Sequence, residues 1–414
     1  MIDLLKKQIE QKIGKEITNR GDCEMISNAI LQTLDVNISY NTIRRLFGLA
    51  TYTKPNKKTL DILSKFLGYK NYFHFSQNAQ YKEKTEFQND MYKVIYHNDI
   101  EAITALIKNR KVNQQNYSGF IAQLSRELLY DKSYSNLNTV FKLQNLDYKT
   151  FTYSELLHIG NSIGLIIRKQ EHYNEALFYN TNFLHCVYLT FVDYSSLNGY
   201  YGAWAKKILQ KKPSREITIF TSAILEFNKF INNKSINPKV DNLIYTDDLN
   251  PILCSRLLAL KLLKANETET IEVLHKYYTI HSKRANLTDY SYELFTTSIV
   301  TKNLQIMGFL VQKIILRVKF YYQKSHLNSF YLMGAFYYKL IGDEKKEAEY
   351  NTLFSLNECR YSYEEFISLL YQIYLYDSAE GLSNKTKIKK KYIQLSKKLN
   401  YPYFSENYLT DYFK

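Results

Sequence analysis

The sequence predicts an all-α protein. Its 414 residues include only 13 glycines and 5 prolines, whereas a β-rich chain of this length needs many tight turns, which consume those two residues. Apolar residues recur every three or four positions along most of the chain, which is the spacing of one face of an α-helix. Together these observations favour long helices joined by short links.

Length and segment composition narrow the class further. A chain of this length predicts two or three domains or one array of repeats. The charged N-terminus, MIDLLKKQIEQKIGKE, lacks the apolar centre of a signal peptide. The most apolar stretch, residues 304–322, is interrupted by Lys313, Arg317 and Lys319 and predicts a buried amphipathic helix. The four cysteines are far apart, which predicts neither a disulfide framework nor a zinc site. We therefore expect a cytoplasmic protein with no membrane partner.

The first 80 residues predict short helices with tight links. The expected helices cover residues 2–14, 22–34, 40–47 and 57–67, followed by a short closing helix in the aromatic run 71–75. Asp22, Ser39 and Asn56 stand where N-caps are expected, and Gly68 stands where the fourth helix should end.

From about residue 85 the pattern is one helix after another. The expected pairs are 86–97 with 99–109, 116–131 with 134–145, and 153–169 with 173–190. Further helices are expected at 215–232, 250–265, 268–283, 288–302, 304–322, 326–341, 343–357, 362–377 and 385–399. Helix pairs that repeat every 35–40 residues or so are typical of an α-solenoid. Residues 232–250 predict either an irregular link or a short inserted helix.

Two segments resemble the tetratricopeptide (TPR) pattern. In residues 162–177, Gly164 stands where two helices must approach closely, and Tyr173 and Ala176 follow at the spacing of a second packed helix. Residues 330–350 carry a similar run, one residue out of register, at Gly334, Tyr337, Gly342, Asp343 and Ala348. The other helix pairs match poorly, so the body is described as TPR-like only.

The charge balance is strongly basic. The net charge is +15 and the isoelectric point is about 9.2, which favours an anionic partner such as nucleic acid. A codon bias toward Lys, Asn, Ile and Tyr would also make the chain basic without any such partner. Residues 1–80 contain 12 lysines and arginines and 7 acidic residues, so the N-terminal segment also has a net positive charge.

The stretch ISYNTIRRLFGL, residues 38–49, predicts a short helix with two distinct faces. Ile43, Leu46 and Phe47 form the buried stripe. The outward face then carries Tyr40, Asn41, Arg44 and Arg45. Arginine offers a rigid donor fork to guanine or phosphate, and asparagine can pair with adenine through two hydrogen bonds. The link to the preceding helix is short, as in a helix-turn-helix.

This region resembles the XRE or phage-repressor helix-turn-helix family. The matches are Ile38-Ser39 and Thr42-Ile43 in ISYNTIRRLFG, then Pro55, Thr59-Leu60, Leu63, Leu67 and Gly68 in KPNKKTLDILSKFLG. The resemblance covers about residues 20–75. Thr33 and Asn37 stand where the family has a small residue and a turn glycine, and asparagine tolerates the left-handed conformation such a glycine serves. Alternatively the turn carries an insertion and Ala29 takes the small position.

The outward helix face and the flanking lysines together predict a DNA-binding site. The candidate residues are Ser39, Tyr40, Asn41, Thr42, Arg44, Arg45, Lys54, Lys57 and Lys58. The three lysines lie around the start of the next helix, where phosphate contacts would set the register on DNA. The competing interpretation is that Arg44 and Arg45 are simply solvated, or form ion pairs with Asp22 or Glu24.

Other chemistry is not indicated by the sequence. No metal-ligand spacing, glycine-rich phosphate loop or nucleophile motif is present, so we expect no catalytic residues, no metal, no cofactor and no enzyme activity. Residues 385–398 carry seven lysines and no acid. They predict a terminal helix with a polar outer face, and a second nucleic-acid contact is the minor alternative.

The expected organisation is a helix-turn-helix DNA-binding domain at residues 1–80 and a TPR-like helical-repeat domain at residues 85–414. This layout resembles peptide-sensing regulators that join a repressor-type head to a TPR body. The resemblance implies a transcriptional regulator that binds duplex DNA, holds a peptide or protein on the concave face of its body, and forms a homodimer. The alternative is an interaction adaptor whose head docks a protein instead of DNA.

Overall fold

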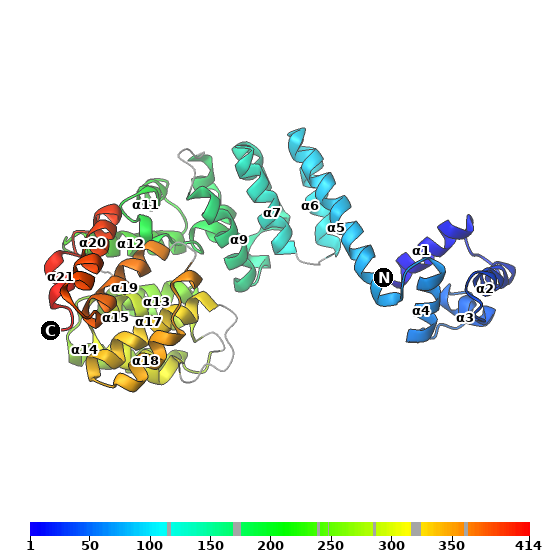
Figure 1. Ribbon diagram of the computed structural model, residues 1–414. Helices are drawn as coiled ribbons and strands as arrows, with labels where there is room; N and C mark the ends of the chain where they lie inside the picture. Colours follow the sequence, from blue (N-terminus) through cyan, green and yellow to red (C-terminus); the bar gives the residue numbers. More distant parts are fainter. Residues whose placement is uncertain are drawn as a thin grey trace. The chain divides into compact units, whose positions relative to one another are not determined.

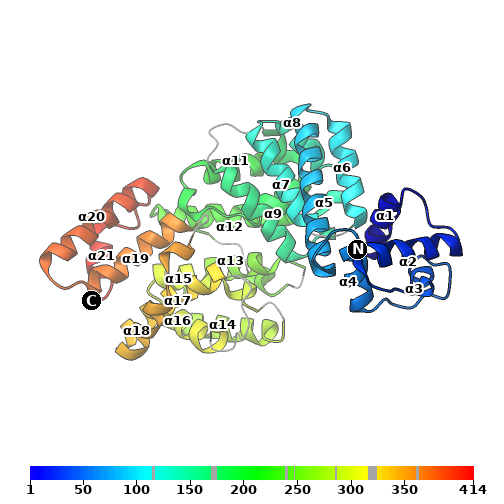
Figure 2. The ribbon, with the colours of Figure 1, turned by 45° about the vertical axis from the view of Figure 1, so that its right-hand side comes forward.

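Helices are the only regular secondary structure among the residues that the structure describes, in a computed structural model of the chain (Figures 1 and 2). The described residues are 1–113, 117–168, 175–237, 241–246, 248–284, 287–315, 324–359 and 363–414. No strand occurs among them, which confirms the all-α prediction. The chain divides into two compact units, Met1–Ile103 and Thr104–Lys414, and each is described by itself.

The first unit contains five helices around one apolar core. They are α1 (Ile2–Ile13), α2 (Arg20–Leu34), α3 (Tyr40–Leu46), α4 (Lys57–Phe66) and α5 (Tyr72–Tyr96). Every one of the five supplies a fully buried side chain, namely Leu5, Ile26, Ile43, Leu63 and Phe75. The next helix, α6 (Ile100–Asn113), contains the boundary between the two units.

Helix α5 differs from the sequence expectation. The short helix expected at 71–75 and the separate helix expected at 86–97 are one continuous helix, because no glycine or proline interrupts the chain between Gly68 and Tyr96. The expected division at residues 80–85 therefore falls inside a helix. The domain ranges 1–80 and 85–414 stay a prediction.

The expected caps are confirmed at two helices and wrong at a third. The side chains of Ser39 and Asn56 cap α3 and α4. The N-cap of α2 is Asn19, not Asp22; Asp22 is the third helical residue and completes a capping box with Asn19. The left-handed residue that ends α2 is Asp35 (φ 53°), and not Asn37.

Asp22 also ties the start of α2 to the preceding loop. Its carboxylate lies 2.5 Å from Lys15 Nζ and accepts hydrogen bonds from the backbone N–H groups of Thr18 (2.9 Å) and Asn19 (3.1 Å). The bond from Lys15, followed by the bond from Thr18, lowers the pKa of Asp22 to about 2. The ionised carboxylate therefore stabilises the folded first unit.

This shift predicts an acid-dependent loss of stability. In an unfolded chain the pKa of aspartate is about 3.9, so the contribution of Asp22 is fully present above that pH and is lost as the pH falls through about 2. Asp22→Asn should be less stable than the wild type near neutral pH, and the difference should shrink toward pH 2. Amide hydrogen exchange of α2 at both pH values measures it, and a pH-independent difference would contradict the assignment.

The second unit contains the remaining α-helices. They are α7 (Tyr117–Tyr130), α8 (Tyr134–Val140), α9 (Tyr153–Ile167), α10 (Thr181–Phe183), α11 (Tyr200–Gln210), α12 (Arg215–Ile231), α13 (Pro251–Leu262), α14 (Glu267–His281), α15 (Leu294–Val300), α16 (Leu304–Phe309), α17 (Lys324–Ile341), α18 (Glu344–Leu353), α19 (Glu364–Ser378), α20 (Leu382–Leu399) and α21 (Glu406–Asp411). Helices α11 and α21 were not anticipated from the sequence. The stretch 232–250 contains one short 3₁₀ helix among its described residues, Asp241–Tyr245.

Two of the expected helices are broken. Residues 173–190 were expected to be one helix, but they contain the 3₁₀ helix Glu175–Tyr179, the single turn α10 and the π-helix Leu184–Tyr188. The expected helix 304–322 is α16 followed by the π-helix Leu310–Ile314, and its end lies outside the described residues. One extra residue per turn, as in a π-helix, shifts the side chains that follow onto a different face.

The broken helix expected at 173–190 lies where the chain packs closely against α9. A Cβ on Gly160 would lie 2.7 Å from the carbonyl oxygen of Cys186, and a Cβ on Gly164 would lie 2.1 Å from the ring of Phe191. The predicted close approach at Gly164 is present, but the partner is this ring. Tyr173 lies outside the described residues, and Ala176 belongs to the 3₁₀ helix.

The second TPR-like segment forms a tight helix pair. A Cβ on Gly334 of α17 would lie 2.2 Å from the ring of Tyr350 on α18. Gly342 makes the turn with φ 76°, and the Asp343 carboxylate caps α18 by accepting the Lys346 backbone N–H at 3.1 Å. The glycine and aspartate spacing predicted this pair correctly.

The C-terminal segment returns to the middle of the same unit. The Tyr401 hydroxyl donates to the Tyr194 carbonyl (2.5 Å), and the Tyr403 backbone N–H donates to the Ile231 carbonyl (3.1 Å). The Tyr412 hydroxyl donates to the Ile299 carbonyl (2.6 Å). In a simple solenoid each repeat contacts only its neighbours. These three hydrogen bonds instead join the C-terminal residues to segments that are distant in sequence.

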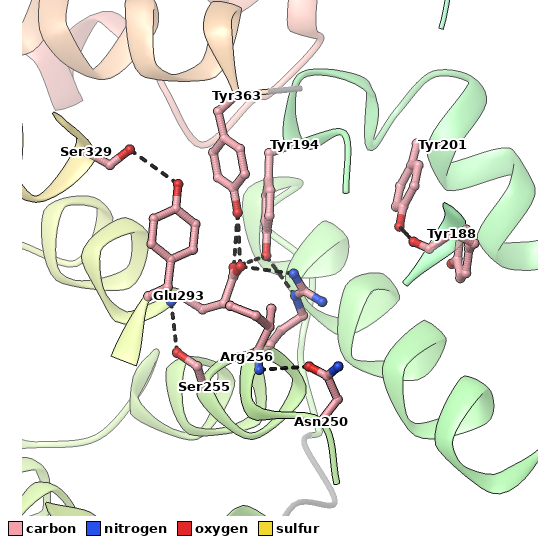
Figure 3. Close-up of polar contacts among 11 residues, drawn as sticks. Tyr188, Tyr194, Tyr201, Asn250, Ser255, Arg256, Glu293, Ser329 and Tyr363 are labelled. Carbon is pink, nitrogen blue, oxygen red and sulfur yellow. Dashed lines mark hydrogen bonds and ion pairs between the residues drawn. The ribbon is translucent and has the colours of Figure 1, made fainter. Parts of the chain in front are cut away.

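A buried ion pair joins four segments of the second unit (Figure 3). Arg256 Nη2 of α13 donates to Glu293 Oε1 at 3.0 Å, with the two side chains 4% and 3% exposed. The hydroxyls of Tyr194 and Tyr363 donate to the same carboxylate at 2.5 and 3.1 Å. The Glu293 backbone N–H donates to Ser255 Oγ at 2.9 Å. The carboxylate thus connects the segments before α11, in α13, before α15 and before α19.

Removing one charge of this pair should destabilise the second unit. Glu293→Gln leaves the Arg256 guanidinium buried without a counter-charge, which costs about 3–5 kcal/mol. Denaturant unfolding followed by tyrosine fluorescence measures the loss. The double variant Arg256→Met/Glu293→Leu should recover most of it, because no unpaired charge then remains in the core. Wild-type stability of Glu293→Gln would contradict this role.

Among the described residues, no helix combines the length and the apolar composition needed to cross a bilayer.

Candidate nucleic-acid interface

Helix α3 is held against α2 by its apolar side and by one hydrogen bond, and a second hydrogen bond caps its N-terminus. Ile43 and Leu46 are buried in the core of the first unit, as predicted, and Phe47 is half-buried. Ser27 Oγ of α2 donates to the Ile38 carbonyl at 2.5 Å, just before α3 begins. The Ser39 hydroxyl accepts the Asn41 backbone N–H at 3.2 Å. The packing therefore fixes which face of this short helix points outward.

The outward face carries the polar residues expected there. Ser39, Asn41 and Arg45 are exposed. Tyr40, Thr42 and Arg44 are half-buried. Arg44 Nη1 donates to Asn41 Oδ1 at 3.2 Å, and Arg44 Nη2 donates to the Leu49 carbonyl at 3.4 Å. Arg44 is therefore partly ordered by its own chain, and Arg45 is the more accessible guanidinium.

A neighbouring basic residue, Arg20, was missed by the sequence interpretation. Its guanidinium lies 4.8 Å from the centre of the Tyr40 ring and pairs with Glu24 at 2.7 Å. Arg20 is the first residue of α2, so recognising Asn19 as the N-cap would have included it in the helix. The contact with Tyr40 has no sequence signal, because it depends on how α2 and α3 pack.

The ion pairs considered for Arg44 and Arg45 are not formed. In the described part of the chain no carboxylate lies within 4 Å of either guanidinium. Asp22 pairs with Lys15, and Glu24 pairs with Arg20. The acidic residues near α3 therefore have other partners, and the positive charge of the outward face is not neutralised by them.

The flanking lysines form a second exposed set. Lys54 lies in the loop before α4, and Lys57 and Lys58 are its first two residues; all three are exposed. The Asn56 side chain accepts the Thr59 backbone N–H at 2.8 Å. Among the described contacts, none joins these lysines directly to the side chains of α3. They surround a helix N-terminus, whose free N–H groups and dipole favour an anion.

The lysine-rich helix α20 is anchored by Tyr392 and Leu399, which are buried. Lys389 pairs with Glu406 and Lys398 with Glu365. These pairs and the buried stripe agree with a terminal helix that has a polar outer face.

The three cysteines of the second unit and His185 are buried. Burial raises the pKa of the thiols of Cys186 and Cys254 to about 12 and that of Cys359 to about 11, which disfavours the nucleophilic thiolate. Burial, followed by the charge of Lys149, lowers the pKa of His185 to about 4. In the part of the chain that is described, no cluster of three or more His, Cys, Asp or Glu residues could hold a metal ion.

Comparisons with known proteins assign no family: no protein-family model matches the chain, and searches of curated proteins and solved structures find no significant similarity. The geometry of α2, α3 and α4 is therefore the basis for assigning a function. Chemically, an exposed guanidinium and an exposed amide on one short helix can donate to base edges, and nearby lysines can contact phosphates.

Proposed function

We propose that the protein is a DNA-binding transcriptional regulator. In this proposal α2 and α3 form a helix-turn-helix of the XRE or phage-repressor type, and α3 is the recognition helix in the major groove. The proposal extends the resemblance in residues 38–49 and 55–68 to function.

One observation carries this proposal. Arg45 and Asn41 are exposed on α3, while the two acidic residues considered as partners of its arginines, Asp22 and Glu24, are paired with Lys15 and Arg20. A guanidinium fork that is already satisfied by a carboxylate cannot pair with guanine without first breaking that bond. Among the described residues Arg45 has no carboxylate partner, so it could pair with guanine without first breaking an ion pair.

The lysines around the start of α4 would supply the sequence-independent part of binding. Lys54, Lys57 and Lys58 are exposed, and contacts from lysine to phosphate fix orientation on the duplex and make affinity fall with salt. Base contacts from α3 would then determine which DNA sequence is bound, and phosphate contacts from α4 would supply affinity for any sequence.

The second unit would sense a peptide or protein partner and hold two copies of the chain together. Both roles follow from the resemblance to peptide-sensing regulators with TPR bodies, and the tight α17–α18 pair supports a TPR-like element in this unit. A homodimer would place two recognition helices on successive turns of DNA.

The double variant Arg44→Ala/Arg45→Ala tests DNA binding. Each lost base contact should cost about 1–3 kcal/mol, so affinity for bound chromosomal fragments should fall by roughly tenfold or more. Thermal stability should not change, because Arg45 is exposed and Arg44 makes only two long hydrogen bonds. Fluorescence anisotropy at several salt concentrations measures the affinity.

The control is Lys7→Ala/Lys65→Ala, which removes the same charge from exposed positions on α1 and α4. It should bind DNA as the wild type does, apart from a small uniform electrostatic effect. If the arginine variant binds as tightly as this control, α3 does not read DNA. If the wild type has no DNA affinity near physiological salt and a protein copurifies with it, the adaptor function replaces the regulator.

A further inference from the structure

The second unit has an open groove with a volume of about 450 Å³. It is lined by side chains of α14, of α16 with the following π-helix, and of α17. Clefts of roughly 300–1,000 Å³ are typical of small-molecule sites. Nothing in the proposed DNA contact uses this groove.

The groove gathers exposed apolar side chains from three separate helices. Ile271 of α14 is 49% exposed, Leu304 of α16 is 40% exposed and Ile341 of α17 is 49% exposed. Isolated exposed apolar residues are ordinary on protein surfaces, but a contiguous set that lines one concavity marks a binding surface. The occupant should therefore have a substantial apolar part.

One of the residues that line this groove is a glycine, Gly308. Gly308 is buried in α16, and a Cβ at this position would lie 3.3 Å from the Tyr337 hydroxyl. Any larger side chain here would extend into the space between α14 and α17. The position is therefore suited to a substitution that fills the groove.

The charges at the groove are asymmetric. Lys313 lines it, and its Nζ lies 5.7 Å from the centre of the Tyr278 ring. None of the described lining residues carries a carboxylate, although Glu267 accepts a hydrogen bond from the lining residue Gln305 at 2.5 Å. Gln305 lies in α16, and Lys313 lies eight residues further along the chain, in the π-helix that follows. One end of the groove is therefore positive and the other lies near an acid.

Few polar groups are available to an extended peptide. Gln305 is already bonded to Glu267, and the lining is otherwise dominated by aliphatic and aromatic side chains with His275, Gln312 and Lys313. A peptide backbone that enters an apolar groove needs hydrogen-bond partners for its N–H and C=O groups, or it loses free energy. An unbranched hydrocarbon chain has no such requirement.

We propose that this groove binds a small amphiphile, namely an apolar chain that ends in a single carboxylate. The carboxylate pairs with Lys313 beside Tyr278. The apolar chain runs past Gly308 toward Ile271 and Leu304, so that its methyl end, and not its carboxylate, lies at the end of the groove near Glu267. The site is independent of DNA binding by the first unit.

The test uses the full chain and three probes that share an unbranched ten-carbon chain: decanoate and decyltrimethylammonium below their micellar concentrations, and decanol below its solubility limit. Isothermal titration calorimetry without DNA should show saturable one-to-one binding of decanoate. Decanol and the ammonium should bind roughly tenfold more weakly, because decanol brings no negative charge to Lys313 and the ammonium brings a like charge. Since no DNA is present, the outcome is separate from that of the regulator proposal.

Two variants locate the site. Lys313→Glu should weaken decanoate roughly tenfold or more and should not weaken the ammonium, whereas Lys264→Glu, at an exposed position outside the groove, should change neither. Gly308→Leu should abolish binding of all three probes. Circular dichroism checks its fold, and Gly308→Ala, which needs only a small shift of Tyr337, should show an intermediate loss.

Three results would overturn the proposal. They are no saturable binding of decanoate by the wild type, equal affinity for the carboxylate and the ammonium, or unchanged decanoate binding in both Lys313→Glu and folded Gly308→Leu. Tighter binding of an uncharged apolar decapeptide than of decanoate would also overturn it, because the groove would then be a peptide site.

Discussion

The first unit depends on the burial of one side of α3. This helix has seven residues, and isolated helices shorter than about 12–15 residues are marginal in water. It exists because Ile43 and Leu46 enter the core, because Ser39 caps it and because Ser27 fixes the Ile38 carbonyl that precedes it. The same burial leaves Asn41 and Arg45 exposed, so stability and the proposed function are set by one packing arrangement.

The second unit is organised by buried polar contacts as well as by apolar packing. Glu293 receives hydrogen bonds from Arg256, Tyr194 and Tyr363, and the hydroxyl of Tyr401 brings the C-terminal segment to the carbonyl of Tyr194. Buried charges and hydroxyls are costly unless every partner is in place. These contacts therefore favour one arrangement of the segments before α11, in α13, before α15 and before α19, which are distant in sequence.

Most local signals, such as caps and turns, were predicted correctly from the sequence, whereas the breaks in two helices were not. The caps at Ser39 and Asn56 and the turn at Gly342 are set by neighbouring residues, so their residue types were sufficient. The helix expected at 173–190 is broken where the chain packs onto Gly160 and Gly164 of α9, and apolar spacing contains no information about such packing. The sequence also predicted Asp22 instead of Asn19 as the N-cap of α2. Both residue types cap helices, and only the hydrogen bonds of the folded chain distinguish their roles.

The candidate site was also only partly predictable. Helical spacing placed Asn41 and Arg45 on the outward face, which the structure agrees with. It could not show that Arg44 would bond to the Leu49 carbonyl, that Arg20 would lie beside Tyr40, or that Lys15 and Arg20 would occupy the nearby acids. Each of these depends on contacts that form only when the chain has folded.

The most direct test of the central claim is selection of genomic DNA fragments by the purified full chain, followed by sequencing of what is retained. We expect the wild type to enrich fragments that share a sequence, and this enrichment to disappear in Asn41→Ala/Arg45→Ala while retention through salt-sensitive phosphate contacts persists. Retention of the same fragments by both proteins, or no enrichment by the wild type, would contradict the claim that α3 reads DNA.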